Sequence, residues 1–390
     1  MSKESGSNEC SRVLVLNPGS TSPKLGVYTP RGAEWVGTIA HGDEELNRFR
    51  GRPMLARLDY RAGLIRDAMD EAGYNQAGCG GERFAAVAGR GGLLPPMQCG
   101  TYLVDDAMVE ELRLARHGEH ACNLGALLAL RFAAAAGVNA YIVDPVTVDE
   151  WQTCARVTGS PLVARFCIGH ALNTKAVARR FALEQGRAYE ALRLIVVHMG
   201  SGITVSAHRD GRTIDSNTIE EGPFGPDRSG GLPVRELIKL CYSGRFAQKE
   251  MDRMVFGDGG LFAYLGTRDL REVERRIDAG EGKAAQVFDA MVYQIAKEAG
   301  AMAAVLEGRV DALLLTGGMA YSERVVEKLR GYLEWIAAIR VYPGEDELQA
   351  LAEGVFRVLT GQEKAKRLWE DGRVEGQPAA DTGRLVIGLE

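Results

Sequence analysis

The chain has 390 residues, of which 46% are hydrophobic and 25% are charged, so its composition is that of a globular protein and excludes a disordered or collagen-like chain. Its 47 lysines and arginines against 52 aspartates and glutamates give a net charge of −5, which provides no overall attraction for nucleic acid or anionic lipid. This length predicts two domains or one large α/β unit.

Signals for secretion and membrane insertion are weak in this sequence. Met1–Cys10 is polar and does not resemble a secretory signal, and the richest apolar stretch, Leu124–Val138, is interrupted by Arg131. The seven cysteines include no C-x-x-C pair, which argues against a metal ribbon or a disulfide framework. We therefore expect a cytoplasmic protein without a membrane span.

The first half of the chain is predicted to begin with two antiparallel strands. Arg12–Leu16 and Leu25–Tyr28 are rich in β-forming residues, and the polar turn Asn17–Ser20 separates them. A second turn follows at Pro30–Gly32. The other elements predicted in this half are a helical region at 43–75, a strand at Phe84–Ala88, helices at Asp105–Arg116 and Leu124–Ala136, and a strand at Ala140–Val143.

The second half repeats this opening pattern. Leu194–Val197 is predicted to be a buried strand, and a Gly/Ser turn, a strand at Ile203–Ala207 and a turn at Gly211 follow it. The segments Asn17–Gly32 and His198–Gly211 thus form a weak internal repeat, which a chance recurrence of hairpins would also produce. The remaining predicted elements are helices at 283–307 and 321–335 and a strand at Ala312–Leu315. This alternation favours duplicated α/β domains with a cleft between two similar halves.

Three glycine-rich turns follow predicted strands. The first, Asn17–Lys24, combines glycine, hydroxyl groups and a lysine, which can bind phosphate oxygens, and its asparagine can meet a metal-bound water. The second, His198–Gly202, and the third, Thr316–Tyr321, offer backbone N–H groups. The alternatives are a Ser/Thr turn with a solvated lysine for the first and plain hairpin or strand–helix turns for the others. Three such turns in one chain favour a nucleotide site.

Two arginines stand in loops that are too rich in glycine and proline for a helix. Arg90 lies in the run Gly89–Gly92 after a predicted strand, and Arg228 lies in the run Gly222–Gly231. A guanidinium held on a fixed loop suits phosphate or carboxylate. A surface arginine in a tight turn is the equal alternative for each.

Other polar residues stand near the ends of predicted elements. His170 precedes a predicted helix and is more often a polar packing residue than a ligand, whereas Asp144 follows a predicted strand, where a functional carboxylate or a capping aspartate is expected. His117 and His120 have no clear third ligand, so we interpret them as surface residues and not as a zinc site.

Several motifs together resemble the signatures of the acetate and butyrate kinases. They are N-P-G-S-T-S-x-K at 17–24, H-M-G-S-G-I-T-V at 198–205, G-P-F-x-P-x-R-S-G-x-L-P at 222–233, G-L-F-A-Y-L-G-T at 260–267, T-G-G-M-A-Y at 316–321 and Y-P-G-E-D-E at 342–347. The resemblance covers residues 12–361. It implies a carboxylate kinase of the sugar kinase/Hsp70/actin superfamily, with two duplicated ribonuclease-H-like domains and an active-site cleft between them.

Within this family, the sequence is similar to the butyrate kinase branch, which includes branched-chain fatty acid kinases. The runs G-H-A-L-N-T at 169–174 and P-D-R-S-G-G at 226–231 stand where acetate kinases typically carry F-H-G-T-S-H and G-T-R-S-G-D. The resemblance implies reversible phosphorylation of butyrate, or a branched-chain analogue, by ATP with Mg²⁺. Acetate or propionate kinase activity is the alternative within the class, and a non-catalytic nucleotide-binding module is the alternative outside it.

The resemblance also implies roles for the residues that match the family motifs. Arg90 and Arg228 would contact the transferring phosphoryl group, His170 would lie near the γ-phosphate, and Asp144 would stand at the interdomain strand end. The residues implied to bind nucleotide or phosphate are Ser20, Ser22, Lys24, His198, Gly200, Ser201, Gly202, Gly317, Gly318 and Tyr321.

The magnesium shell would include Asn17 and one carboxylate of the segment 345–347, with Glu347 favoured and Glu345 as the alternative. The implied N-terminal ribonuclease-H-like domain spans 12–146 and is completed by a helix at 348–361. The nucleotide-binding domain spans 147–347, and an accessory tail spans 364–390. The implied partners are a small carboxylic acid and ATP or ADP, and the family suggests a homodimer or a higher homo-oligomer.

Overall fold

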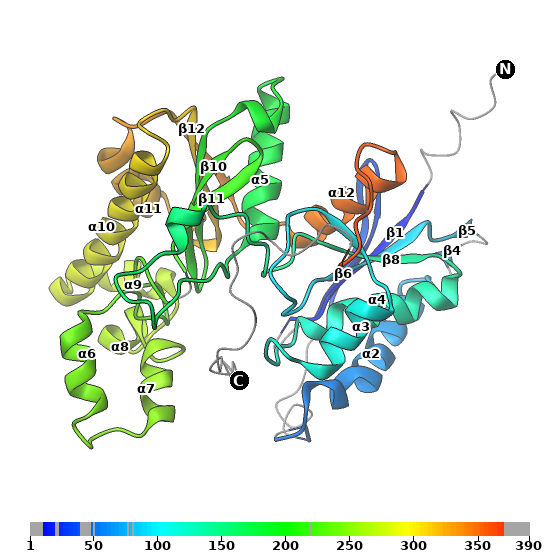
Figure 1. The fold of residues 1–390 in the computed structure, drawn as a ribbon, viewed down its shortest axis with the longest axis horizontal. Coiled ribbons are helices and arrows are strands. Elements are labelled where there is room, and N and C mark those ends of the chain that lie inside the picture. Colours follow the sequence, from blue (N-terminus) through cyan, green and yellow to red (C-terminus); the bar gives the residue numbers. More distant parts are fainter. Residues whose placement is uncertain are drawn as a thin grey trace. The chain divides into compact units, whose positions relative to one another are not determined.

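Two mixed β-sheets organise the chain, one in each of two units (Figure 1). The computed structural model describes residues 11–19, 23–39, 48–49, 51–75, 78–79, 82–218 and 220–369. The first unit comprises Met1–Asp149 together with Asp346–Glu390, and the second comprises Glu150–Glu345. Each unit has its own hydrophobic core.

The sheet of the first unit has the strand order β3-β2-β1-β6-β8-β7. β1, β6 and β8 are parallel to one another, whereas β2, β3 and β7 are antiparallel to their neighbours. The strands are β1 (Val13–Asn17), β2 (Lys24–Thr29), β3 (Gly32–Thr38), β6 (Ala86–Arg90), β7 (Thr101–Leu103) and β8 (Asn139–Val143), and β4 (Gly78–Cys79) pairs with β5 (Glu82–Arg83) in a separate small hairpin.

Helices cover both faces of this sheet. α4 (Asn123–Ala136) packs against β1, β6 and β8, and α12 (Glu347–Leu359) packs against β1, β2, β6 and β8. Leu14 of β1 belongs to the core that contains α4, and the alternation of side chains along a strand directs its buried neighbour Val15 to the opposite face. The other helices of the unit are η1 (Met54–Arg57), α2 (Leu58–Glu71) and α3 (Asp106–Leu114).

The sheet of the second unit has the order β11-β10-β9-β12-β13. β9, β12 and β13 are parallel, and β10 and β11 continue from β9 as antiparallel hairpin strands. The strands are β9 (Leu194–Met199), β10 (Ile203–Arg209), β11 (Arg212–Ser216), β12 (Ala312–Gly317) and β13 (Ile339–Pro343).

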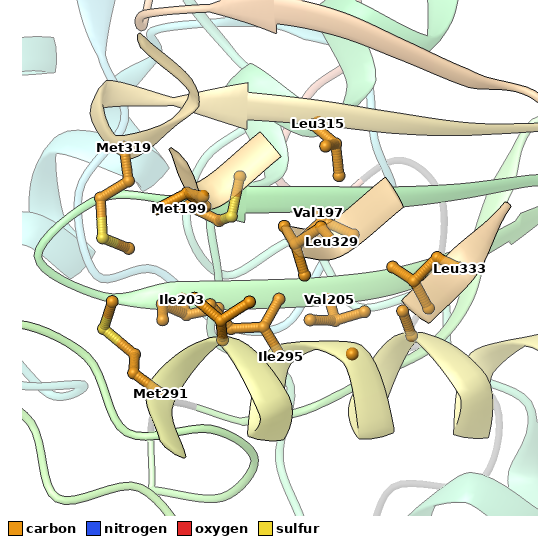
Figure 2. Close-up of a cluster of buried hydrophobic side chains, with 14 of the residues drawn as sticks. Val197, Met199, Ile203, Val205, Met291, Ile295, Leu315, Met319, Leu329 and Leu333 are labelled. Atoms are coloured by element: carbon orange, nitrogen blue, oxygen red, sulfur yellow. The ribbon is translucent and has the colours of Figure 1, made fainter. Parts of the chain in front are cut away.

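One face of this second sheet packs on α5 (Ala171–Glu184) and the other on the long helix α10 (Gly282–Val305). Figure 2 shows the core between this sheet and α10, in which Val197 and Val205 of the sheet lie over Ile295 of α10. Met199 and Met319 lie together at the end of the layer where β9 and β12 end (Figure 2). The other helices are η2 (Thr153–Arg156), η3 (Tyr189–Ala191), α6 (Val234–Cys241), α7 (Gln248–Val255), α8 (Gly260–Leu265), α9 (Leu270–Asp278), η4 (Gly318–Tyr321) and α11 (Glu323–Leu333).

The two sheets share one topology. In each, three consecutive antiparallel strands are followed by two strands parallel to the first, so β1-β2-β3-β6-β8 corresponds to β9-β10-β11-β12-β13. The predicted α/β class with two similar halves is confirmed. None of the described helices is long and apolar enough to cross a lipid bilayer.

Several predicted boundaries need correction. The strand predicted at Phe84–Ala88 lies at Ala86–Arg90, and β12 continues through Gly317, so part of the third predicted turn is strand. Within 43–75 the α-helix is confined to Leu58–Glu71, and residues 43–47 and 50 lie outside the described residues. In the helix predicted at 321–335, Tyr321 ends the 3-10 helix η4 and Ser322 caps the next helix, so α11 begins only at Glu323.

Candidate active site

Three predicted residues meet in the first unit. Asn17 ends β1, Arg90 ends β6, and Glu347 begins α12. The Asn17 Nδ2 donates to Glu347 Oε2 at 2.6 Å, and the Arg90 guanidinium forms an ion pair with the other oxygen of the same carboxylate. The side chains of Arg90 and Glu347 are both largely buried, which strengthens their attraction relative to a surface pair.

The backbone before Arg90 is held against α4. A Cβ atom on Gly89 would lie 2.2 Å from the carbonyl oxygen of Gly125, and one on Gly125 would lie equally close to the carbonyl oxygen of Arg90. Both positions therefore exclude any side chain, and β6 contacts the first turn of α4 directly. This contact fixes the backbone from which the Arg90 side chain extends.

Asp144 follows β8 directly and is 1% exposed. Its backbone has a φ of 38°, in the left-handed region that few non-glycine residues adopt. One carboxylate oxygen accepts the Gly100 N–H at 2.7 Å, and the Asp144 N–H donates to the Gly100 oxygen at 3.0 Å. Because Val143 pairs with Arg90, the strand register places Asp144 one residue beyond the position opposite Arg90.

The first glycine-rich turn is partly described. Lys24 begins β2, pairs with Asn17 across the β1–β2 ladder, and has an exposed side chain. Ser20 and Ser22, which the sequence assigns to phosphate binding, lie outside the described residues.

Two histidines stack in the second unit. They are His170, which precedes α5, and His198, in β9. Their ring centroids are 3.8 Å apart, and the angle between the ring planes is 14°. The His170 Nδ1 shares a hydrogen bond of 2.8 Å with the Thr204 hydroxyl, and the His198 Nδ1 shares one of 2.9 Å with the Asn173 side chain. The His198 Nε2 lies 3.2 Å from Glu345 Oε1, without the alignment of a hydrogen bond.

Arg228 lies over the second glycine-rich turn. A Cβ atom on Gly202 would be 2.6 Å from the Arg228 Nη1, so the guanidinium occupies the space that a side chain would need. The Phe256 ring lies 5.6 Å from the guanidinium carbon. Burial lowers the pKa of Arg228, although the neighbouring Asp227 carboxylate opposes this shift. Among the described residues, no carboxylate forms an ion pair with Arg228.

The loop that carries Arg228 is anchored on α8. The Gly225 N–H donates to the Arg228 oxygen at 3.1 Å, and the Gly225 oxygen accepts the Leu261 N–H at 3.0 Å. The Asp227 oxygen accepts two further backbone N–H groups, from Gly257 and Gly259. These bonds hold the loop without regular secondary structure and fix the position of the arginine backbone.

The third glycine-rich turn lies where β12 and β13 end. Gly317 has a φ of +89°, and a Cβ atom there would lie 2.4 Å from the Met199 oxygen. Gly317 and Gly344 exchange two backbone hydrogen bonds of 3.1 and 3.0 Å. Gly318 is exposed and nothing crowds the position of its missing side chain. Tyr321 is 72% exposed.

An open depression of about 540 Å³ adjoins this turn. Apolar side chains provide part of its lining, and two carboxylates of α11 border it. The lining residues are Ala320, Tyr321, Glu323, Val326, Glu327, Val341 and Pro343.

Comparisons with known proteins identify the family of this chain. The model of the acetokinase family matches residues 159–341. Probable butyrate kinases of Listeria monocytogenes, from serotype 4b and serovar 1/2a strains, are 45% identical over 356 residues, which cover 91% of this chain and 98% of each relative. The chain belongs to the acetokinase family. The family predicted from the motifs is confirmed.

Solved structures of two short-chain carboxylate kinases share the fold. The acetate kinase of Porphyromonas gingivalis has a TM-score of 0.73 at 19% identity, with 90% of this chain and 100% of that chain covered. The propionate kinase of Francisella tularensis subsp. tularensis has a TM-score of 0.66 at 16% identity, with 88% and 98% covered. At these identities the likeness is one of fold, and it agrees with the two-sheet α/β architecture described above.

Sequence analysis of this acetokinase-family chain missed two residues that contact the predicted histidines. Asn173 and Thr204 bond to the stacked histidines, and their only sequence signal is their place inside the motifs at 169–174 and 198–205. His117 and His120, which we interpret from the sequence as surface residues, are half-buried: the His120 Nδ1 lies 2.9 Å from the buried Cys122 sulfur, and the His117 Nε2 lies 3.8 Å from the Glu111 carboxylate. Burial raises the pKa of that thiol to about 11.

Proposed function

We propose that this protein transfers the γ-phosphoryl group of ATP reversibly to a short-chain fatty acid, butyrate or a branched-chain analogue, giving the acyl phosphate and ADP. The similarity to probable butyrate kinases supports this reaction, because it extends over 91% of the chain at 45% identity. In the forward direction a carboxylate oxygen forms a bond to the γ-phosphorus, and the bond to the β-phosphate oxygen breaks in line with it.

The reaction needs no strong general base. A fatty acid is already ionised at neutral pH, so its oxygen can attack without losing a proton. Catalysis then depends on holding acid and nucleotide in line and on stabilising the charge of the transferring group. Fixed cations are the groups that this mechanism requires.

Arg228 is the structural observation that carries the proposal. Its guanidinium lies against Gly202 of a phosphate-type turn, burial has removed part of its hydration, and no described carboxylate forms an ion pair with it, although the Asp227 charge acts on it. A planar guanidinium can bind two phosphoryl oxygens at once. We assign Arg228 to the equatorial oxygens of the transferring phosphoryl group.

Arg90, His170 and Asp144 complete the proposed catalytic set. The ion pair with Glu347 uses part of the Arg90 guanidinium, and its other N–H groups are assigned to the phosphoryl group and the acid carboxylate. The edge of the His170 ring opposite its Thr204 bond is assigned to a γ-phosphate oxygen. The bond from the Gly100 N–H orients Asp144, whose second oxygen is assigned to the reacting centre.

The nucleotide is assigned to the glycine-rich turns. Gly200, Ser201, Gly202, Gly317 and Gly318 would face phosphate and ribose oxygens, together with Ser20, Ser22, Lys24 and His198. The Gly200 and Gly317 N–H groups donate to the Gly202 and Gly344 oxygens, so the backbone donors assigned to the nucleotide are those of Ser201, Gly202 and Gly318. The depression beside Tyr321 suits an adenine ring, because it offers apolar side chains for stacking and the carboxylates of Glu323 and Glu327 for the exocyclic amine. ATP and ADP are thus the nucleotides that the proposal requires.

Asn17 and Glu347 fit a magnesium shell. They present amide and carboxylate oxygens, the hard donors that Mg²⁺ prefers, and Mg²⁺ that arrives with a nucleotide needs only one or two protein oxygens besides phosphates and waters. Glu345 is the alternative carboxylate. When bound, Mg²⁺ would neutralise charge on the nucleotide phosphates. The two assigned residues would hold its water shell in place.

We also propose the domain limits 12–146 with 348–361 and 147–347, an accessory tail at 364–390, a cytoplasmic location and a homo-oligomeric state, as the family resemblance implies. The boundaries between the two compact units differ from these by two or three residues, and they place Glu347 in the first unit. Of the tail, residues 370–390 lie outside the described residues.

Hydroxamate trapping of the acyl phosphate tests the proposed function. Each methylene that a pocket buries contributes about 0.8 kcal/mol, so we expect a graded kcat/KM over acids of three to five carbons, with acetate weak. An optimum at acetate would replace the butyrate assignment with acetate kinase activity. The absence of product with every acid, although ATP binds, would favour the non-catalytic module.

A further inference from the structure

His170 occupies a helix start without capping the helix. It precedes Ala171, the first residue of α5, and its side chain makes no capping hydrogen bond. Serine, threonine, aspartate and asparagine are the residues that ordinarily stabilise this position. The ring instead packs against the sheet, where its edge meets Thr204 and its face meets His198.

The sheet register explains both contacts. Thr204 of β10 is directly opposite His198 of β9, so the two side chains lie on the same face of the sheet. That face packs on α5. Thr204 therefore bonds to the edge of the His170 ring, and His198 stacks on its plane. Together the two contacts fix the orientation of the ring.

α5 fixes the second histidine in turn. Asn173 lies three residues after His170, and its side chain bonds to the His198 Nδ1 at 2.9 Å. The His198 Nε2 is 3.2 Å from the Glu345 carboxylate, and the residue is 1% exposed. Both ring nitrogens of His198 thus face protein groups, which suits a support for His170 better than the phosphate contact that the motif suggests.

We propose that Thr204 is a positioning residue, which fixes the orientation and the tautomer of His170 with the support of His198 and Asn173. Among the described residues, His170 is the one partner of the Thr204 hydroxyl, so this hydroxyl can donate its hydrogen to Nδ1. The proton of a neutral His170 then resides on Nε2, the atom that can donate to a phosphoryl oxygen. This inference rests on the proposed kinase function and on the role assigned there to His170.

The closing experiment compares variants of the full-length protein in steady-state acyl phosphate formation. Thr204→Val keeps the shape but removes the hydroxyl, and we expect kcat to fall roughly tenfold, as when other partners that orient a catalytic group are removed, with KM for ATP and acid little changed. Thr204→Ser restores the hydroxyl and should restore kcat. If Thr204→Val does not fold, Thr204→Ala, which adds no methyl group, carries the same expectation.

Ser206→Ala is the matched control. Ser206 is on the same strand and the same face, is 1% exposed, and its hydroxyl lies 2.8 Å from the Nε2 of a different histidine, His208. A purely structural role for buried hydroxyl–histidine bonds would lower kcat and thermal stability alike in both variants. Positioning by Thr204 predicts a loss of kcat in Thr204→Val alone.

The double variant separates action through His170 from an independent effect. Adding Thr204→Val to His170→Ala should change kcat by less than about twofold, because the threonine would have no ring left to orient. A full additional loss, or an unchanged kcat in Thr204→Val alone, would overturn the inference. A wild-type protein that phosphorylates none of the acids would instead overturn the proposed function, so the two failures are distinct.

Discussion

The two units carry different chemistry at corresponding strand ends. In the first unit, β1, β6 and β8 end at or beside the side chains of Asn17, Arg90 and Asp144. In the second, β12 ends at Gly317 and β13 ends beside Gly344, and these two glycines exchange backbone hydrogen bonds. One topology thus ends in polar side chains in one unit and in paired glycine backbone in the other. The sheet determines where functional groups stand, and the residues at its ends determine which ligand atoms they suit.

The two arginines sharpen this contrast. Arg90 extends from a strand end and is paired with Glu347, whereas Arg228 extends from an irregular loop and has no ion-pair partner among the described residues. A paired cation adds little net charge to its surroundings, but a partly dehydrated, unpaired one attracts an anion strongly. Arg228 should therefore contribute more to the stabilisation of the transferring group.

The largest effect is expected for Arg228→Ala. Removing the unpaired guanidinium should lower kcat roughly 10²–10³-fold, as for other electrostatic donors at a reacting centre, with a much smaller change in ATP affinity. Arg228→Lys should recover little, because an ammonium cannot bind two oxygens in one plane. Steady-state kinetics together with nucleotide binding by calorimetry would measure both quantities.

Arg245→Ala provides a control for the Arg228 variant. The Arg245 guanidinium also packs on an aromatic ring, that of Phe246 at 5.3 Å, but it is exposed and lies outside the glycine-rich turns. Its removal should leave kcat unchanged. An Arg228→Ala protein with wild-type kcat would show that the unpaired cation has no part in catalysis.

Gly317→Ala tests the glycine ends of the second unit. A side chain there would meet the Met199 backbone in a left-handed conformation, and strain of this kind costs about 1–3 kcal/mol of unfolding free energy. Gly318→Ala is the matched control, since its neighbourhood is open and its φ is not in the left-handed region. Denaturant unfolding of both variants should give a clear loss for Gly317 and almost none for Gly318. Equal stabilities would mean that the close approach of β12 and β9 is not required.

The next largest effect is a change in the Mg²⁺ requirement, which should distinguish the role of Glu347 from that of Glu345. Glu347 contacts Asn17 and Arg90 in the first unit, and Glu345 lies beside His198 in the second. Glu347→Gln should raise the Mg²⁺ concentration for half-maximal activity roughly tenfold, the size expected when a group that orients a metal shell loses its charge. Glu345→Gln should raise it less, and the reverse order would transfer the magnesium role to Glu345.

Sequence patterns were sufficient where hydrophobic runs mark buried strands. β1, β9 and β12 are fully buried, and the predicted strands fall on them with small shifts of their ends. β3 was missed because it is an edge strand on which exposed and half-buried residues replace the apolar run, and β7 because it has three residues. A short or exposed strand is specified by its neighbours and not by its own composition.

The sequence predicts which residues belong to the candidate site, because they lie in motifs, but it does not predict which of them contact each other. The sequence indicates Arg90, Arg228 and His170, yet nothing in it indicates that Glu347 pairs with Arg90. Only Asp346 separates Glu345 from Glu347, but the end of β13 and the start of α12 place them in different units. The contacts of Thr204 with His170 depend on strand register and helix docking, which no local pattern encodes.

The smallest expected effect is on the pH dependence of stability, and it arises on the face of the second sheet that packs on α5. Besides apolar residues, that face buries a polar network in which His208 bonds to Ser206 and Tyr189, near the buried pair of Lys175 and Glu150. Burial and the nearby cations Lys175 and Arg179 hold the pKa of His208 well below its ordinary value of 6.5. The folded protein therefore keeps His208 neutral, whereas the unfolded chain takes up a proton as the pH falls below that value.

His208 should make the folded protein less stable as the pH falls. Above pH 7 neither state is protonated at His208, so the stability it contributes is fully present, and below pH 6.5 that stability is lost by up to about 1.4 kcal/mol per pH unit. His208→Gln should remove this part of the slope while other groups titrate as before. Urea unfolding of wild type and variant at several pH values between 7.5 and 5.5 would measure the difference at each pH. Parallel stability curves would mean that His208 takes up its proton equally in both states and that the network admits a charge.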